Sequence, residues 1–286
     1  PGWEQHLRQQ CRTAGIDQKH TADLLDKGQY ERVIEEIENL CGRNVFTQEI
    51  RDIFSRTGEI TDITLRITEL FTDTIITTNY DRLIEQAFDT GKKNAFQIIN
   101  GLSVLEKPAA DRVTIIKLHG DINNPAKCII SKNQYDEAYG NEQINLTLPI
   151  PRLLSYYFRN SSLLFLGCSL KEDRTIQVFR AVKASIGDAI IPQHFSIEQA
   201  PDNEEELVKR NTYLANLGIT AIWFEKGCFD FVESILRLAR NELRYKGIMP
   251  SNQAQSIVDL PTIAATHNRF IDKLFSRWRI WNGIRT

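Results

Sequence analysis

Three short polar motifs in this sequence each follow a run of apolar residues. They read Thr77-Thr78-Asn79-Tyr80-Asp81, Lys117-Leu118-His119-Gly120-Asp121 and Gly167-Cys168-Ser169-Leu170. An imidazole titrates near neutrality, and an amide side chain both donates and accepts hydrogen bonds. The motifs therefore offer groups suited to acid–base chemistry and polar binding, next to a small-residue loop that a ligand can approach closely.

The runs that precede these motifs are short and rich in β-branched residues, which predicts strands. Such runs occupy residues 74–78, 113–118, 163–166, 195–197 and 219–224. Helical patterns separate several of them, at residues 81–88, 172–184 and 204–217. This alternation predicts an α/β fold with a Rossmann-like, doubly wound parallel sheet. Ligands bind beyond the carboxyl ends of strands in such sheets, so we expect the three motifs to share one edge.

The first seventy residues instead show a helical spacing of their apolar positions. The clearest stripe ends at Gly42, which suits a helix C-cap, and comprises Tyr30, Val33, Ile34, Ile37 and Leu40. We therefore predict a helical subdomain at residues 1–72 and a Rossmann-like core at residues 73–246. A linker and a helical C-terminal tail are expected at residues 247–286.

The composition excludes several classes of protein. Hydrophobic residues make up 42% of the 286 positions, enough for a sizeable core, and the formal net charge of -2 argues against a protein that coats nucleic acid. The five cysteines form no C-x-x-C pair, so we expect neither a disulfide framework nor structural zinc. No apolar run reaches the ~18–20 residues that cross a bilayer, and we expect a cytoplasmic protein.

Each motif alone has an ordinary structural explanation. An Asn-Tyr-Asp segment after a strand commonly caps a helix, a histidine at a strand end is commonly structural, and Gly-x-Ser is common in turns. Their coincidence at the ends of three predicted strands of one sheet favours a functional site.

Taken together, the three motifs resemble those of sirtuins. Thr77-Thr78-Asn79-Tyr80-Asp81 is similar to the sirtuin T-x-N-x-D motif, His119-Gly120 to the catalytic His-Gly, and Gly167-Cys168-Ser169-Leu170 to Gly-Thr-Ser-Leu. The flanking residues more closely resemble the bacterial sirtuin-like branch that acts in antiphage defence, as in Thoeris systems. The resemblance covers about residues 1–225 and implies an enzyme that consumes NAD.

Two departures from protein-deacetylating sirtuins bear on the reaction. The zinc-binding cysteines have no counterpart and a helical insertion stands in their place, while Thr78 replaces the usual Gln. Both departures favour hydrolysis of NAD over deacylation of a peptide. The family also carries a Gly-Ala-Gly-x-Ser phosphate loop ahead of a Pro-x-Trp segment, which Pro1-Gly2-Trp3 resembles. We therefore expect that loop upstream of Pro1 in a longer protein.

The resemblance implies a role for each site residue. Asn79 would hold the reactive water or a ribose hydroxyl, His119 would act as the general base, and Asp81 would bind the nicotinamide carboxamide. The other NAD-binding positions would be Thr77, Thr78, Gly167, Cys168 and Ser169. NAD is then the substrate, and the expected reaction cleaves its nicotinamide–ribose bond to deplete NAD in an abortive response to phage.

The sequence leaves other functions open. The same chemistry would serve an NAD-dependent protein deacylase or an ADP-ribosyltransferase, and a degenerate domain would sense a nucleotide without turnover. The resemblance also implies a homo-oligomer, with a HerA-type ATPase or a short Argonaute as partner. Basic and aromatic residues at 266–286 suggest a subunit interface more than nucleic-acid binding.

Overall fold

The structure is a computed structural model, and it describes residues 3–54, 58–90, 95–101, 111–171, 173–187 and 190–247. The predicted C-terminal tail, with its candidate interface at residues 266–286, lies outside these ranges. The chain forms two compact units. The first comprises Pro1–Ile60, Phe71–Arg159 and Cys168–Ile190, and the second comprises Thr61–Leu70, Asn160–Gly167 and Ile191–Thr286.

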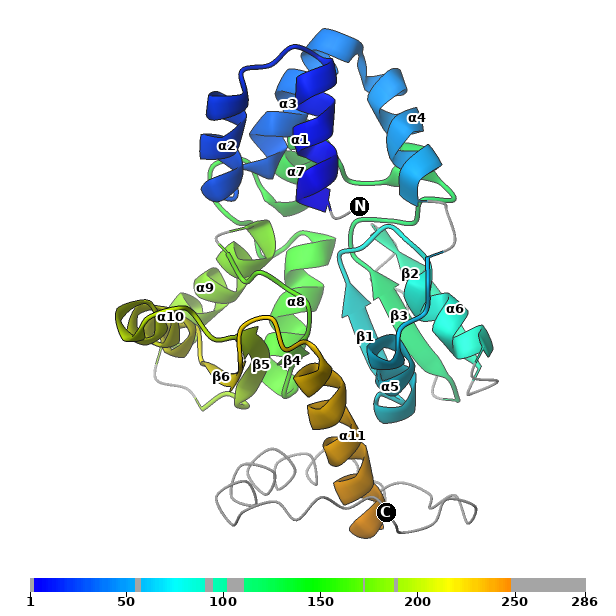
Figure 1. The fold of residues 1–286 in the computed structure, drawn as a ribbon, viewed down its shortest axis with the longest axis vertical. Helices are drawn as coiled ribbons and strands as arrows, with labels where there is room; N and C mark the ends of the chain where they lie inside the picture. The colour runs from blue at the N-terminus through cyan, green and yellow to red at the C-terminus, as the bar shows by residue number, and fades with distance from the viewer. Residues whose placement is uncertain are drawn as a thin grey trace. The chain divides into compact units, whose positions relative to one another are not determined.

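The first unit combines a helical bundle with a parallel sheet (Figure 1). The bundle consists of α1 (Trp3–Thr13), α2 (Gln18–Asp26), α3 (Tyr30–Cys41) and α4 (Arg43–Phe54). The sheet and its helix consist of β1 (Thr74–Thr77), α6 (Leu83–Thr90), β2 (Phe96–Asn100) and β3 (Val113–Lys117). The chain then forms a 3-10 turn, η2 (Pro125–Lys127), followed by α7 (Lys132–Tyr139), α8 (Pro149–Asn160) and α9 (Arg174–Ile186).

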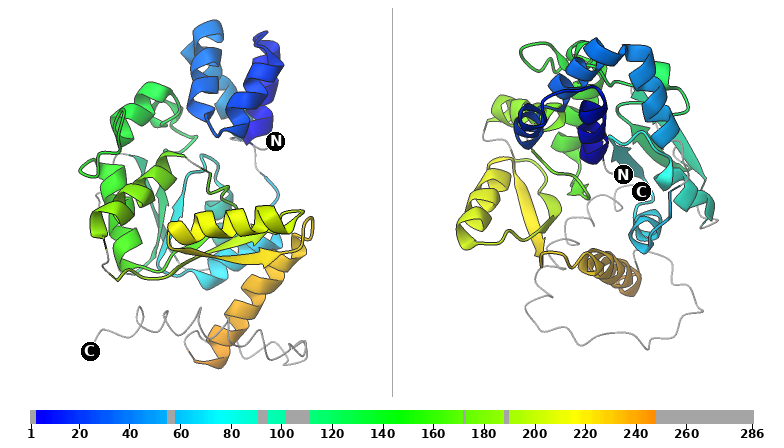
Figure 2. Two further views of the ribbon diagram at one scale, coloured as in Figure 1. Left: turned by 90° about the vertical axis from the view of Figure 1, so that its left-hand side faces the viewer. Right: turned by 45° about the horizontal axis from the view of Figure 1, so that its top comes forward.

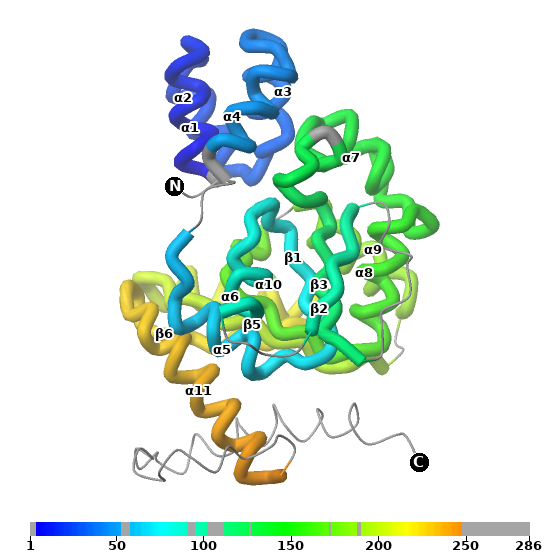
Figure 3. Tube along the Cα trace, turned by 90° about the vertical axis from the view of Figure 1, so that its right-hand side faces the viewer, coloured from blue at the N-terminus to red at the C-terminus, as the bar shows by residue number. Residues whose placement is uncertain are grey.

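The apolar stripe predicted in the bundle is the buried face of α3. Val33, Ile34 and Ile37 are buried, whereas Leu40 at the end of the stripe faces solvent. The helix ends at Gly42, whose φ of 83° suits glycine. Helix α3 also packs against α7 (Figure 3).

The bundle core extends into the loops that follow the sheet strands. Its buried cluster includes Leu7, Leu25 and Phe46 from the helices together with Tyr80 and Ile122 from those loops. The bundle therefore packs directly on the segments that carry Asn79 and His119.

In the sheet of the first unit, the strand order is β1-β3-β2 and both pairings are parallel. All five residues of the central strand β3 are buried. On one face, Phe88 of α6 packs with Val113 and Ile115. Strand β2 was not predicted, because Gln97 interrupts its short apolar run and polar residues precede it.

The second unit contains another three-stranded parallel sheet, with order β4-β5-β6. Its elements are α5 (Asp62–Leu70), β4 (Leu164–Phe165), β5 (His194–Gln199), α10 (Glu204–Asn216), β6 (Ile219–Phe224) and α11 (Asp230–Tyr245). Helix α10 runs along β6 (Figure 2), and α11 packs on α5. The predicted α/β fold with parallel strands is confirmed, while the predicted domain limits stay a prediction.

Candidate active site

The parallel register places Asn79 and His119 at matching positions. Thr77 pairs with Lys117 at the last rung between β1 and β3, and the Leu118 N–H donates to the Thr77 carbonyl at 2.9 Å. Asn79 and His119 each come two residues after that rung. The loops with the predicted amide and imidazole therefore leave adjacent strands at the same edge of the sheet, where ligands bind in such folds.

A buried lysine joins these two loops. Lys117 is fully buried, and its Nζ donates to the Tyr80 carbonyl at 3.2 Å and also to the Asp81 carbonyl. The same ammonium lies 2.9 Å from Oε1 of Glu85 in α6 and 3.2 Å from Oδ2 of Asp121. Partners of this kind are required because a buried charge without them is strongly unfavourable. The ammonium thus connects the β1 loop, α6 and the β3 loop.

The loop after β1 leaves its polar side chains accessible. The Asn79 N–H donates to Oγ1 of Thr77 at 3.1 Å, while Thr78 and Asn79 are themselves exposed. Oδ1 of Asp81 accepts the N–H of Leu83 at 3.0 Å and so caps α6. Asp81 therefore has the helix-capping role that the sequence allowed, and the Asn79 amide is free to meet a ligand.

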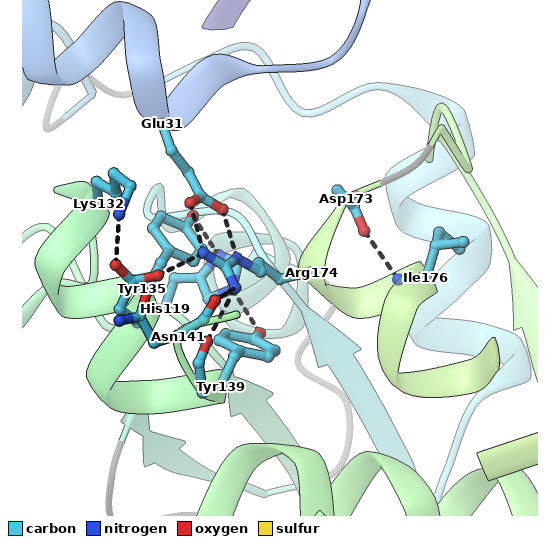
Figure 4. Close-up of polar contacts among 11 residues, drawn as sticks. Glu31, His119, Lys132, Tyr135, Tyr139, Asn141, Asp173, Arg174 and Ile176 are labelled. Carbon is cyan, nitrogen blue, oxygen red and sulfur yellow. Dashed lines mark hydrogen bonds and ion pairs between the residues drawn. The ribbon is translucent and has the colours of Figure 1, made fainter. Parts of the chain in front are cut away.

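His119 is enclosed by tyrosines, and only 7% of it is exposed. Its Nε2 lies 2.8 Å from the Tyr139 hydroxyl and its Nδ1 lies 3.2 Å from the Tyr135 hydroxyl (Figure 4). The ring of Tyr80, the neighbour of Asn79, lies 6.4 Å from the imidazole between centroids. The site residues on the two loops are thus linked through Tyr80.

Burial controls the protonation of this cluster. Desolvation lowers the pKa of His119 to about 4, so the imidazole is neutral near pH 7. It also raises the pKa of Tyr80, Tyr135 and Tyr139, so these phenols stay protonated. The imidazole is therefore in the form that a general base requires.

The third motif forms the turn that leads to α9. Gly167 has a φ of 65° and Leu170 a φ of 44°, both in the left-handed region. Cys168 and Ser169 are exposed in the first unit, and Gly167 belongs to the second. Asp173 then caps α9 by accepting the Ile176 N–H at 2.9 Å. The first unit thus holds all the predicted site residues except Gly167.

The motifs fall within a family match. Residues 73–222 match the SIR2-like domain, and this span includes all three motifs. The chain belongs to the SIR2-like family. The resemblance to sirtuins predicted from the motifs is confirmed.

Several relatives of this SIR2-like chain are named NAD(+) hydrolase ThsA. The protein of Cytobacillus dafuensis is 27% identical over 186 residues, which cover 65% of this chain and 35% of the relative. The protein of Enterococcus faecium is 25% identical over 292 residues, which cover 96% of this chain and 59% of the relative. The protein of Bacillus cereus (strain MSX-D12) is 24% identical over 265 residues, which cover 88% of this chain and 53% of the relative. The chain thus spans only about a third to three fifths of the length of these relatives.

The described part of the SIR2-like chain contains no group of three or more His, Cys, Asp or Glu side chains arranged to hold a metal ion. None of its helices is both long and apolar enough to cross a membrane.

Sequence reasoning missed several residues that build this site. Lys117 belongs to the second motif, and a lysine that ends an otherwise apolar strand is a signal for a buried ion pair. Tyr135 and Tyr139 lie four residues apart, a spacing that puts two side chains on one face of a helix. Nothing in the sequence indicated that this face meets His119.

Proposed function

We propose that this SIR2-like chain carries the catalytic site of an NAD hydrolase that cleaves the nicotinamide–ribose bond. The observation that carries the proposal is the matched placement of Asn79 and His119 beyond the last rung of β1 and β3. The relatives named NAD(+) hydrolase support the choice of NAD and of water as the final acceptor.

The proposed reaction needs an accessible amide and a neutral base. Departure of nicotinamide leaves positive charge on the ribose, and a water must then be held and deprotonated. The exposed Asn79 amide holds this water or a ribose hydroxyl, and His119 accepts its proton. Asp81 binds the nicotinamide carboxamide through the carboxylate oxygen that does not cap α6. Four small or polar residues complete the NAD site, namely Thr77, Thr78, Gly167 and Ser169, with Cys168 beside them.

The biological setting belongs to the same proposal. Depletion of cytoplasmic NAD would make the protein an effector of bacterial antiphage defence, in keeping with its sirtuin-like motifs. A homo-oligomer, with a HerA-type ATPase or a short Argonaute as partner, would restrain an activity that is toxic when unregulated.

Nicotinamide release from NAD by the full-length protein tests the proposed reaction. Asn79→Ala and His119→Ala should each lower the rate by about 10²–10⁴-fold, the usual range for loss of a catalytic acid–base group. The assay is run without peptide and then with an acylated peptide, since a deacylase would release nicotinamide only with the peptide.

Two matched variants control for the substitutions themselves. Asn211→Ala removes an exposed amide from α10, and His20→Ala removes an exposed imidazole whose partner is Glu36. Both should leave the rate unchanged, because exposed ion pairs contribute little to stability. Equal rates for wild type and His119→Ala would contradict the proposal.

A further inference from the structure

The His119 imidazole has a tyrosine hydroxyl at each of its two nitrogens. Tyr135 lies 3.2 Å from Nδ1 and Tyr139 lies 2.8 Å from Nε2. The two tyrosines are one turn apart in α7, and their rings lie 5.0 and 5.9 Å from the imidazole between centroids. Only 7% of His119 is exposed, so these hydroxyls largely take the place of water around the ring.

The charged groups around α7 are bound to one another and not to His119. Arg174 of α9 pairs with Glu31 of α3 at 3.0 Å and with Asp136 of α7 at 2.5 Å, and Lys132 pairs with Asp136 at 2.6 Å. In the part of the chain that the structure describes, no carboxylate forms a hydrogen bond or an ion pair with His119. The two phenol oxygens are therefore the acceptors that this part of the protein offers to the ring.

The number of ring protons distinguishes the two charge states of His119. A neutral imidazole has one N–H and one bare nitrogen, so one tyrosine accepts from the ring and the other donates to it. Tyr135 and Tyr139 can exchange these roles, because a hydroxyl both donates and accepts. An imidazolium has two N–H groups, and both tyrosine oxygens then accept. The pair thus serves the neutral ring in either tautomer and the protonated ring as well.

Loss of one hydroxyl affects the two charge states unequally. The neutral ring can place its bare nitrogen at the empty position and keep its N–H on the remaining tyrosine. The imidazolium of His119 would instead have an N–H without an acceptor in a site that is almost closed to water. Hydrogen bonds of a charged group are about twice as strong as neutral ones, so the protonated ring loses more. Each hydroxyl therefore favours the charged form, whichever tautomer the neutral ring adopts.

We infer that Tyr135 and Tyr139 stabilise the protonated state of His119, because their two oxygens accept both N–H groups of the imidazolium. The consequence for rate rests on the proposed NAD hydrolysis, whereas the effect on protonation does not. In that reaction an O–H bond of water or of a ribose hydroxyl breaks, and the electron pair stays on that oxygen. The tyrosine hydroxyl at the bare nitrogen passes its own proton to the ring and receives the one released. Its oxygen then accepts the new N–H.

An NMR pH titration of the His119 ring in the full chain tests the effect on protonation, with the signals assigned by their loss in His119→Gln. Burial lowers the pKa of His119 to about 4 in the wild type. Tyr135→Phe and Tyr139→Phe should each lower this pKa further, because they delete the hydroxyl and keep the aromatic ring. An unchanged or raised pKa in either variant would overturn the inference.

The kinetic test compares kcat and KM for nicotinamide release. Tyr135→Phe and Tyr139→Phe should each lower kcat about 10–100-fold, the usual effect of a hydrogen bond to a charged group, while KM stays constant. Tyr157→Phe is the matched control. It deletes the hydroxyl of another buried tyrosine, which lies 3.4 Å from Thr74 at the opposite end of β1. It should keep the wild-type kcat.

A second background separates this effect from a general structural one. The His119→Gln protein has no imidazole to protonate, so adding Tyr135→Phe or Tyr139→Phe should lower its residual kcat by less than about twofold. Tyrosines that only supported the fold would lower kcat by the same factor with and without His119. That result would overturn the inference.

The outcomes also separate this inference from the proposed function. A wild type that releases no nicotinamide, with a lower His119 pKa in both phenylalanine variants, would refute the hydrolase and leave the stabilisation of the imidazolium intact. An active wild type whose phenylalanine variants keep both kcat and the His119 pKa, with circular dichroism showing all three folded, would refute the stabilisation and leave the hydrolase intact.

Discussion

The Nζ of Lys117 lies 2.9 Å from Oε1 of Glu85, and both side chains are almost completely removed from solvent. Asp121 shares the same ammonium at 3.2 Å. The buried cluster therefore contains two carboxylates and a single cation that also holds the backbone of the Asn79 loop.

Removal of that cation should destabilise the fold. Lys117→Met leaves Glu85 and Asp121 buried without their counter-charge, and breaking a buried ion pair costs about 3–5 kcal/mol. We expect a loss of this size in the free energy of unfolding measured in urea. The control is Lys27→Met, which removes a lysine from an exposed pair with Asp23 and should cost less than about 1 kcal/mol. Equal losses of unfolding free energy in Lys117→Met and Lys27→Met would show that the buried ion pairs of Lys117 stabilise the fold no more than an exposed pair does.

The strands and the motifs that follow them could be predicted because their signals are local. The runs before Asn79 and His119 are β-branched and end in polar residues, and the structure places β1 and β3 within one residue of the predicted limits. The parallel pairing of these two strands follows from their alternation with helices. The juxtaposition of Asn79 and His119 was therefore accessible from the sequence.

The partners of His119 were not accessible in this way. Tyr135 and Tyr139 lie in a segment whose helix is positioned by tertiary contacts, and the pattern of α7 alone does not reveal what it packs on. The same holds for Arg174, whose partner Glu31 is 143 residues away in the chain. Ion pairs and hydrogen bonds across such separations leave no periodic trace in the sequence.

The pKa of His119 makes two pH dependences testable. Because burial lowers this pKa to about 4, the imidazole stays neutral between pH 8 and pH 5. Nicotinamide release should therefore not follow a histidine titration near pH 6.5 in this range. A rate that halves near pH 6.5 and tracks the His119 signal in NMR would contradict the prediction.

The same shift should affect stability in a defined direction. The unfolded chain binds a proton at this imidazole near pH 6.5 and the folded chain only near pH 4, so stability is lost as the pH falls between these values. The free energy of unfolding should fall more steeply over this window for wild type than for His119→Gln. Parallel pH profiles for the two proteins would show that burial of His119 has no such effect.

Gly120, directly after His119, has a backbone that only glycine accommodates well. Its φ is 95°, and a Cβ there would lie 3.1 Å from Cα of Cys128 and 3.2 Å from the Lys127 carbonyl oxygen. Gly120→Ala should therefore destabilise the protein by about 1–3 kcal/mol in urea unfolding. Gly15→Ala is the control, because Gly15 has a φ of 75° but no atom within 4 Å of the added Cβ. Both variants strain a backbone with positive φ, so the difference between their losses of unfolding free energy measures the steric clash at Gly120. Equal losses would show that a Cβ at Gly120 does not clash with Cys128.

Arg174 of α9 holds the helix that carries both tyrosines. Its Nε and Nη2 contact the two carboxylate oxygens of Glu31 at 3.0 Å each, and Nη2 also contacts Oδ1 of Asp136 in α7 at 2.5 Å (Figure 4). Nη1 donates to the carbonyls of Gly140 and Asn141, just beyond the end of α7. One planar guanidinium therefore joins α3, α7 and α9, a geometry that an ammonium cannot reproduce.

Arg174→Lys should for this reason loosen α7 and release the hydroxyls of Tyr135 and Tyr139 from His119. We expect nicotinamide release to fall about tenfold, although the charge is kept. Arg210→Lys is the matched control, because Arg210 contacts Oε2 of Glu198 through Nε and Nη2 in the second unit. That variant should keep the wild-type rate of nicotinamide release. If Arg174→Lys kept the wild-type rate, packing alone would position α7, and the guanidinium would serve only to neutralise Glu31 and Asp136.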